Sequence, residues 1–330
     1  MSEWCYLGID IGGSAIKAGL VTDGGRILQK RHASSALEDG LEAGLANLER
    51  ISRELVADSG VNWDQVRAIG VAAPGTMDIP AGVVFHPFNL PGWKNLPLRD
   101  LVAERLGKPA VLQNDANAAA LGETWLGAGQ DARSLMFWTL GTGVGGGIVL
   151  DGKVLEGAHS HAAECGHIII QQEGGPHSEH GIHGCVELYV GARALIRRCR
   201  EAIKAGHRSS LAAIASDDSK LTPLAIAHAA EEGDDLARGL ILESAKYLAV
   251  GTVNVIHILN PEKVLVGGAM TFGQNKTELG RAFLETLRNE VKKRTFPITG
   301  ERTVIDYASL GNAAGFIGAA ACARIRYPAG

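Results

Sequence analysis

The pattern of apolar and polar residues predicts one supersecondary unit that occurs twice. The first copy covers residues 6–28, where three apolar runs are separated by a Gly12-Gly13-Ser14 turn and an Asp23-Gly24 turn. The second copy covers residues 134–155 and repeats this order, with a turn at Gly141-Thr142-Gly143 and a second Asp-Gly pair. Because Asp-Gly between alternating runs is a strong hairpin signal, each copy predicts three strands. Repeats so far apart indicate two homologous domains rather than a solenoid.

Helical and buried-strand patterns follow each copy. They predict helices, in which apolar residues recur at about 3.6-residue spacing, and short apolar strands. The predicted helices are 41–56, 114–126, 236–259 and 313–324, and the predicted strands are 66–72, 111–113 and 264–266. Strands that alternate with helices indicate a layered α/β architecture. We expect the last helix to pack on the N-terminal domain.

The length of 330 residues favours two domains of ordinary size. No low-complexity linker separates them. We place the smaller domain at residues 1–117 plus 306–330, and the larger one at residues 118–305.

Composition and charge exclude several classes of protein. With a net charge of -4, the chain gives no sign of the basic surface that nucleic acid binding requires. Five scattered cysteines argue against a disulfide framework and favour a reducing cytoplasm. The first residues lack the pattern of a signal peptide, and the most apolar stretches, 135–150 and 247–259, are short and interrupted. We therefore expect a cytoplasmic protein without a membrane span.

The two glycine turns suggest a nucleotide site. Without Cβ atoms, glycines let a phosphate approach backbone N–H groups, and Ser14 and Thr142 add hydroxyl donors at matching places. Either turn alone is explained as an ordinary hairpin. Two matching turns, with Asp10 beside the first, favour loops that hold the phosphates of ATP. The pattern is neither the P-loop nor the strand–GxGxxG–helix fingerprint, because a second strand follows each turn.

Three motifs in this order resemble the ROK (repressor, open reading frame, kinase) family of sugar kinases. They are Asp10-Ile-Gly-Gly-Ser14, Asn114-Asp115-Ala-Asn117 and Leu140-Gly-Thr-Gly-Val-Gly-Gly-Gly147. The resemblance extends almost from end to end of the chain. It implies the fold of the hexokinase–actin–Hsp70 superfamily: duplicated actin-like ATPase domains, ribonuclease H-like in topology, that flank a cleft for nucleotide and sugar.

The resemblance also implies catalytic roles. Asp115 stands between a strand and a helix, where Asp and Asn commonly cap the helix, and the family motif makes it the general base. Asn114 is then a contact for a sugar hydroxyl. Asp10 either caps its own turn or helps to hold Mg²⁺ with the nucleotide phosphates. Lys17 either reaches the phosphates or is solvated.

Further sugar contacts are implied on loops. Glu164 and His167 resemble the Glu-x-Gly-His motif of the family, and Glu187 resembles a third contact. Asn89 resembles another, although an Asx-turn explains it equally well. The adenosine half of ATP is expected near Gly267-Gly268 and Gly311, where close strand–helix packing is the simpler explanation for the glycines.

A structural Zn²⁺ site is common in the family, and this chain departs from its three-cysteine loop. Only Cys185 remains, and Ser178 and His180 occupy the other two cysteine positions. Histidine and thiolate are both good zinc ligands, so His167, His177, His180 and Cys185 form the expected set. The alternative is a degenerate loop with solvated histidines.

The sequence thus predicts an ATP-dependent hexose kinase, with glucose as the expected substrate. Kinases of N-acetylmannosamine, N-acetylglucosamine or fructose share these motifs and are the alternatives. A sugar-responsive repressor of the same family is a third possibility. Such repressors carry a DNA-binding helix-turn-helix before the core, whereas the first motif here begins by Gly8. The net charge also argues against DNA binding. A non-catalytic sugar sensor is a fourth. The resemblance implies a homo-oligomer, either a dimer or a tetramer.

Overall fold

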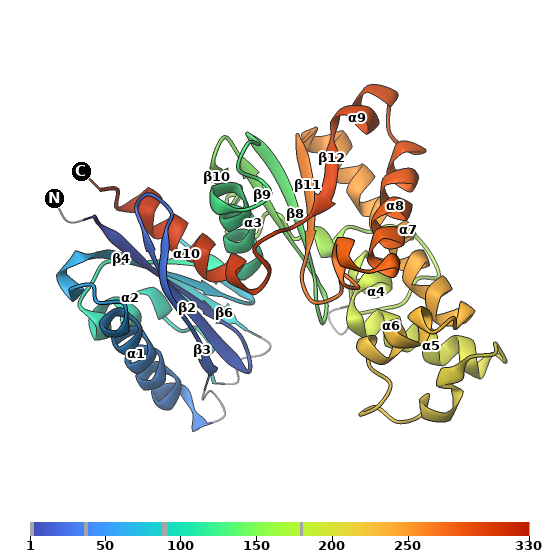
Figure 1. Cartoon of the computed structure of the whole chain (residues 1–330), viewed down its shortest axis with the longest axis horizontal. Coiled ribbons are helices and arrows are strands. Elements are labelled where there is room, and N and C mark those ends of the chain that lie inside the picture. The colour runs from blue at the N-terminus through green and yellow to red at the C-terminus, as the bar shows by residue number, and fades with distance from the viewer. Residues whose placement is uncertain (1–2, 36–38, 88–91, 179–180, 330) are drawn as a thin grey trace. The chain divides into compact units, whose positions relative to one another are not determined.

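The computed structural model describes residues 3–35, 39–87, 92–178 and 181–329. They form two five-stranded sheets with helices (Figure 1). The strand order is β3-β2-β1-β4-β7 in the first sheet and β10-β9-β8-β11-β12 in the second. In both sheets the first strand of the repeated unit lies in the middle, with the other two strands of its unit on one side and two later strands on the other. This shared order confirms the predicted duplication.

Apart from β12, which was not predicted, and β3, which continues to Ser34, the strands lie close to the predicted runs. The first sheet contains β1 (Cys5–Ile11), β2 (Ala15–Thr22), β3 (Ile27–Ser34), β4 (Val66–Ala73) and β7 (Ala110–Asn114). The second contains β8 (Ser134–Leu140), β9 (Val144–Leu150), β10 (Lys153–Val154), β11 (Lys263–Gly267) and β12 (Val304–Tyr307). A separate hairpin, which the sequence patterns did not predict, is formed by β5 (Thr76–Asp78) and β6 (Val83–His86).

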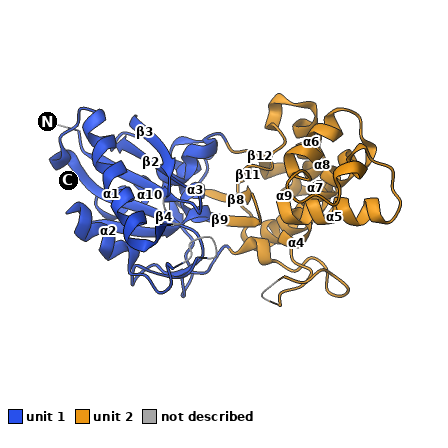
Figure 2. Cartoon of the chain, turned by 90° about the horizontal axis from the view of Figure 1, so that it is seen from below, with its two compact units in different colours: residues 1–133, 147–163, 309–330 blue, residues 134–146, 164–308 orange. Residues whose placement is uncertain are grey.

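The chain divides into two compact units (Figure 2). Unit 1 contains residues 1–133, 147–163 and 309–330, and unit 2 contains residues 134–146 and 164–308. The helices of unit 1 are α1 (Leu41–Asp58), α2 (Leu98–Leu106), α3 (Asp115–Leu126) and α10 (Ala314–Arg326). Those of unit 2 are α4 (Glu187–Val190), α5 (Ala192–Lys204), α6 (Pro223–Glu231), α7 (Asp235–Leu259), α8 (Glu278–Lys292) and α9 (Pro297–Arg302).

The predicted domain boundaries, near residues 117 and 306, divide the chain differently from these two units. Unit 1 also takes in residues 118–133 and 147–163, which the sequence prediction assigned to the larger domain. The domain boundaries themselves therefore stay a prediction.

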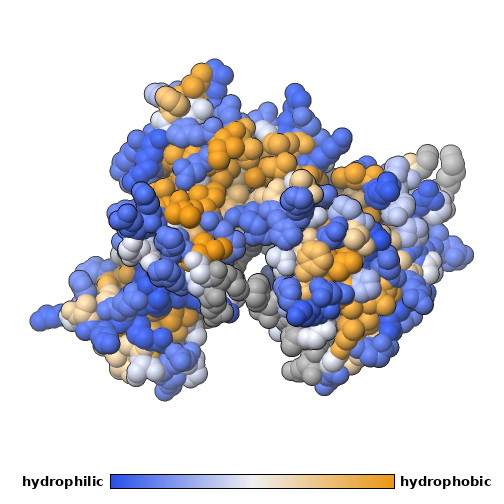
Figure 3. Space-filling view, turned by 180° about the vertical axis from the view of Figure 1, so that it is seen from behind, coloured by the Kyte–Doolittle hydropathy of each residue, from blue (hydrophilic) through white to orange (hydrophobic). Residues whose placement is uncertain are grey.

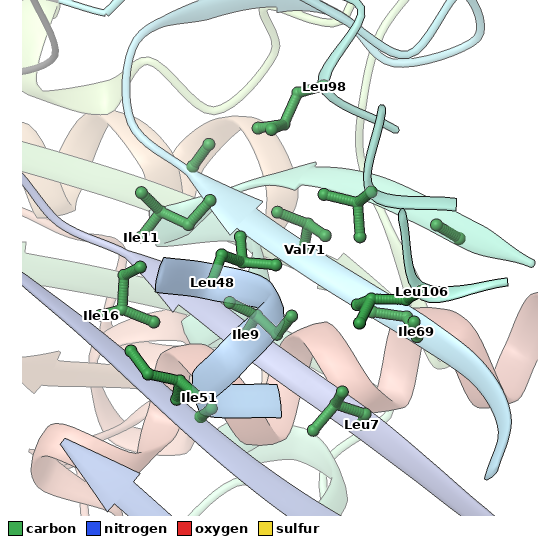
Figure 4. Packing of buried hydrophobic residues seen from close by; sticks show 14 of the residues in the cluster. Leu7, Ile9, Ile11, Ile16, Leu48, Ile51, Ile69, Val71, Leu98 and Leu106 are labelled. Atoms are coloured by element: carbon green, nitrogen blue, oxygen red, sulfur yellow. The ribbon is translucent and has the colours of Figure 1, made fainter. Parts of the chain in front are cut away.

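The core of unit 1 lies between its sheet and α1. Leu48 and Ile51 on α1 point toward Ile9 on β1, and all three side chains are buried (Figure 4). Each such side chain contributes about 1.5–3 kcal/mol through burial. This packing holds β1 rigidly, and the first glycine turn follows directly from its end.

Helix α10 packs closely on the other elements of unit 1. A Cβ atom added to Gly70 on β4 would lie 1.7 Å from the carbonyl oxygen of Ala319, and one added to Gly318 would lie 1.6 Å from that of Ala118 on α3. These two positions therefore accept only glycine in this arrangement. The prediction that the C-terminal helix returns to the N-terminal part of the chain is confirmed.

Helix α7 is the central helix of unit 2. In length and composition it could cross a membrane, but 61% of its most apolar stretch is buried inside the structure, as in the core helix of a globular protein. Thr252 on α7 accepts a hydrogen bond of 3.0 Å from the indole nitrogen of Trp138 on β8, so these two buried polar groups are satisfied internally.

A few large apolar side chains remain on the surface of unit 2. Ile258, Phe296 and Ile298 are more than half exposed, and Figure 3 shows apolar residues gathered between polar ones on the face seen from behind. Single exposed apolar residues are usual in soluble proteins and by themselves identify no binding partner.

Candidate active site

The first glycine turn connects β1 to β2 and is held through its oxygen atoms. The carbonyl of Gly13 accepts a hydrogen bond from the Ser35 hydroxyl at 2.9 Å, and the carbonyl of Ser14 accepts one from the Ser35 amide at 3.1 Å. The amide of Gly12 donates to Ala15 at 2.8 Å. These bonds fix the conformation of the turn without using the N–H groups of Gly13 and Ser14, the groups that would bind an anion.

Asp10 and Lys17 form a pair beside this turn. They lie opposite each other in the β1–β2 register, with 3.5 Å between Lys17 Nζ and Asp10 Oδ2. Burial raises the pKa of the Asp10 carboxyl above its ordinary value, and the charge of Lys17 opposes this shift. Lys17 thus pairs with the buried carboxylate, although its own side chain is 32% exposed. Gly315, near the start of α10, is also required here, since an added Cβ would lie 2.5 Å from Asp10 Oδ2.

Asn114 rather than Asp115 caps helix α3. The Asn114 Oδ1 atom accepts hydrogen bonds from the amides of Ala116 and Asn117, at 3.0 and 3.2 Å. Asp115 is the first residue of the helix, and its Oδ1 accepts a bond of 2.8 Å from the Ala116 amide. The sequence allows Asp115 to be either the helix cap or the general base. The structure assigns the cap to Asn114. The cap uses the side-chain oxygen of Asn114, so the side-chain group that Asn114 can offer a ligand is its Nδ2 amide.

The second glycine turn connects β8 to β9 and is anchored in a similar way. The carbonyl oxygens of Gly141 and Thr142 accept bonds from the first amides of α5, at 3.0 and 3.4 Å. Glu187 supports the same turn, because its Oε2 accepts a 2.9 Å bond from the Val144 amide. A Cβ on Gly143 would lie 2.1 Å from that oxygen. The sequence prediction gave Glu187 only a role in sugar binding, and this contact with the turn was missed.

Glu164 precedes a short 3-10 helix, Cys165–His167, of which His167 is the last residue. Glu164 Oε2 lies 3.9 Å from His167 Nε2, and both side chains are partly exposed. The other ring nitrogen of His167, Nδ1, is buried and has no hydrogen-bond partner within the described ranges. A carboxylate and an imidazole thus lie side by side here, and their role as sugar contacts stays a prediction.

Gly267 is the last residue of strand β11, and Gly268 follows it beside the end of β8. Gly268 has a φ of 93°, and an added Cβ would lie 2.3 Å from the Leu140 carbonyl oxygen. Gly267 lies against the ring of Phe137. Close packing thus explains both glycines, and the adenosine site expected there stays a prediction. Gly311 also has a positive φ, of 54°.

The described residues of the histidine-rich loop form a β-bridge between His177 and His183. His177 faces His183 across a β-bridge, with 5.3 Å between the ring centroids, while Cys185 is bridged to Ile169. Over residues 3–35, 39–87, 92–178 and 181–329, no three His, Cys, Asp or Glu side chains form a group that could hold a metal. His167, His177 and Cys185 are therefore not assembled as the zinc prediction requires. His180 and the predicted sugar contact Asn89 lie outside the described residues.

The duplicated fold and the two anchored glycine turns define the class of protein. An α/β sheet of this order, present twice, is the actin-like ATPase fold. Residues 6–326 match the ROK family, and the chain belongs to that family.

Relatives of the chain include both enzymes and regulators. The chain is 33% identical over 318 residues to a glucokinase of Halalkalibacterium halodurans. The alignment covers 96% of this chain and 94% of the relative. It is 32% identical over 290 residues to a xylose repressor of Caldicellulosiruptor bescii, which covers 88% of this chain and 70% of the relative.

Solved structures give the same picture. The ROK hexokinase of Thermus thermophilus superimposes with a TM-score of 0.81 at 32% identity, over 98% of both chains. A ROK glucokinase of Streptomyces griseus, solved in complex with glucose and AMPPNP, gives a TM-score of 0.78 at 31% identity, over 97% of this chain and 99% of that one.

Proposed function

We propose that the protein is a sugar kinase that transfers the γ-phosphoryl group of ATP to a free hexose, with Asp115 as the general base. The observation that carries this proposal is the cap of α3. Asn114 satisfies the N-terminal amides of the helix, so Asp115 occupies the first turn without serving as the cap. A carboxylate in that place is suited to accept the proton of a sugar hydroxyl as it attacks the phosphorus.

The phosphates of ATP are assigned to the two glycine turns. Both turns are fixed through their carbonyl oxygens, by Ser35 in unit 1 and by α5 in unit 2. Fixed N–H groups stabilise charge on a transferring phosphoryl group without further reorganisation. Mg²⁺ fits beside Asp10, because it is bound by few carboxylates together with nucleotide phosphates, and it would neutralise phosphate charge. The charge of Lys17 would oppose the rise in the pKa of Asp10 that burial causes.

Glucose is the proposed hexose. Asn114, Glu164, His167 and Glu187 supply donors and acceptors of the kind that ring hydroxyls require. The glucokinase of H. halodurans and the glucose complex of the S. griseus enzyme support this choice. N-acetylmannosamine, N-acetylglucosamine and fructose are the alternatives, since the same contacts fit their hydroxyls.

A regulator without kinase activity is the second candidate, because xylose repressors are among the relatives. The net charge of -4 and the presence of Asp10, Asp115 and both turns favour the enzyme. We propose a cytoplasmic location and a homo-oligomeric state on the strength of the family alone.

Zinc is not part of this proposal. His167, His177 and Cys185 do not form a metal-binding group in the described ranges, and the His177 ring instead lies tilted beside that of His183. We expect metal analysis of purified, tag-free protein to find no stoichiometric zinc. One zinc ion per chain, lost together with hexose binding on chelation, would contradict this expectation.

The test of the function is ADP release measured over a panel of free sugars, with wild type and Asp115→Asn. We expect hexose-dependent ADP release, with glucose the best substrate. In Asp115→Asn, kcat should fall by about 10²–10⁴-fold, the contribution typical of a general base. Asn can still accept the Ala116 bond, so the melting temperature should be unchanged. Sugar binding by both proteins without turnover would refute the kinase and favour the sensor.

A further inference from the structure

A buried glutamine stands directly before the catalytic turn and is held from both ends. Gln113 is 2% exposed, on strand β7. Its Oε1 accepts a hydrogen bond of 2.9 Å from the Asn114 amide, and its Nε2 donates one of 2.8 Å to Glu156 Oε1. The two ends of the side-chain amide are thus assigned to different partners.

This arrangement fixes the rotation of the Gln113 side chain. The Asn114 N–H needs an acceptor and the Glu156 carboxylate needs a donor, so a flipped amide would lose both bonds. A buried amide without its partners would cost free energy. As a result, the peptide between Gln113 and Asn114 has one favoured orientation. Asn114 then caps α3, and Asp115 follows in the next position.

Glu156 also belongs to the segment that leads to the sugar-contact motif. Its carbonyl oxygen accepts a 3.0 Å bond from the Ala162 amide, which closes a loop that ends two residues before Glu164. Within this loop Ser160 has a φ of 60° and accepts a 3.0 Å bond from the Ile79 amide through its hydroxyl. Glu156 therefore connects two segments. Its backbone closes the loop at residues 156–162, and its side chain holds Gln113 beside the catalytic turn.

We propose that Gln113 and Glu156 are positioning residues for phosphoryl transfer. Glu156 orients Gln113, and Gln113 orients the Asn114 peptide and with it the Asp115 carboxylate. The proposal rests on the function proposed above, in which Asp115 is the base. Because these positioning roles involve no contact with substrate, their effect should appear in kcat rather than in the KM for hexose or ATP.

A cavity makes this pair accessible to small solutes. Gln113 and Glu156 line a cavity of about 650 Å³ in unit 1, together with Lys153, Cys322 and Arg326. If the Glu156 side chain is removed, a small carboxylate from solution can enter and accept the bond from Gln113. Chemical rescue of this kind separates positioning by a hydrogen bond from a general loss of folding.

The experiment compares five variants by steady-state kinetics and thermal unfolding. Glu156→Gln keeps an acceptor and should retain activity within about threefold, whereas Glu156→Ala and Gln113→Glu should lose about 10- to 100-fold in kcat, as small misplacements of a reacting group do. Formate should restore Glu156→Ala. The double variant Gln113→Glu with Glu156→Gln reverses the direction of the bond and should restore kcat to within about threefold. Glu104→Ala, an exposed acid on α2, is the control.

The outcomes separate this proposal from the function on which it rests. If wild type is active and Asp115→Asn is not, unchanged kcat in Glu156→Ala overturns the positioning role. Loss of kcat together with stability, without rescue by formate or by the double variant, also overturns it. If wild type itself is inactive, amide hydrogen exchange decides: the Asn114 amide should exchange at least about tenfold faster in Glu156→Ala than in Glu104→Ala, and equal rates overturn the proposal.

Discussion

Asn114 combines two roles that substitution can separate. Its Oδ1 accepts hydrogen bonds from two backbone amides at the start of α3, and its side-chain Nδ2 is proposed to donate to a sugar hydroxyl. Replacement of such a cap by Ala costs about 1 kcal/mol, whereas Ser is as good a cap as Asn. Loss of one neutral hydrogen bond to the sugar costs about 1 kcal/mol, which is about a fivefold change in affinity.

Asn114→Ala should therefore lower the free energy of unfolding by about 1 kcal/mol and raise the KM for hexose about fivefold. Asn114→Ser should keep stability within about 0.5 kcal/mol, because a hydroxyl still accepts from the helix amides, yet show the same increase in KM. Urea denaturation gives the first quantity, and ADP release at varied hexose gives the second. A Ser variant with the KM of wild type would refute a direct contact and reduce Asn114 to a cap.

Two further predictions concern other parts of the chain. In Gly143→Ala the new Cβ would lie 2.1 Å from Glu187 Oε2 and would disturb the second turn, so the KM for ATP in the same assay should rise about tenfold, or ~1.4 kcal/mol. Gly239→Ala, where an added Cβ meets open space, is the control, and equal KM values would contradict a role in phosphate binding. At Asp234, burial raises the pKa, but bonds from the Ala237 amide, Ser209 and Ser210 outweigh it and lower the pKa to about 2. Its ionised form thus stabilises the fold above pH 4, and about 1 kcal/mol, reduced for solvent screening, should be lost between about pH 4 and pH 2. Acid unfolding of Asp234→Asn should lack this component, and identical pH profiles would contradict the assignment.

Much of the fold could be predicted because the chain repeats itself. The two Asp-Gly hairpins and glycine turns predicted β1–β3 and β8–β10, and short apolar runs predicted β4, β7 and β11. Strand β12, the β5–β6 hairpin and helices α2, α4, α5, α6 and α9 were missed. Their patterns are short, or depend on local caps such as Thr222 on α6, which the apolar periodicity does not register.

The site was predicted in its residue types but not in its contacts. Glycine turns and an Asn-Asp pair are local signals, since backbone conformation and capping depend on neighbours in the chain. A sequence cannot reveal which of two adjacent residues will cap the helix. In the structure the amides of Ala116 and Asn117 reach the Asn114 side chain, and this decides the matter.

The sequence alone thus determined the duplicated architecture, the family and the residues available for chemistry, because these follow from periodicity and short motifs. Tertiary structure decided which groups meet. Lys17 compensates Asp10 because the two strands place them opposite each other. Glu187 reaches a turn 43 residues earlier in the chain, and Glu156 reaches Gln113 over the same separation. Contacts at such distances depend on the packing of whole elements, which no local pattern encodes.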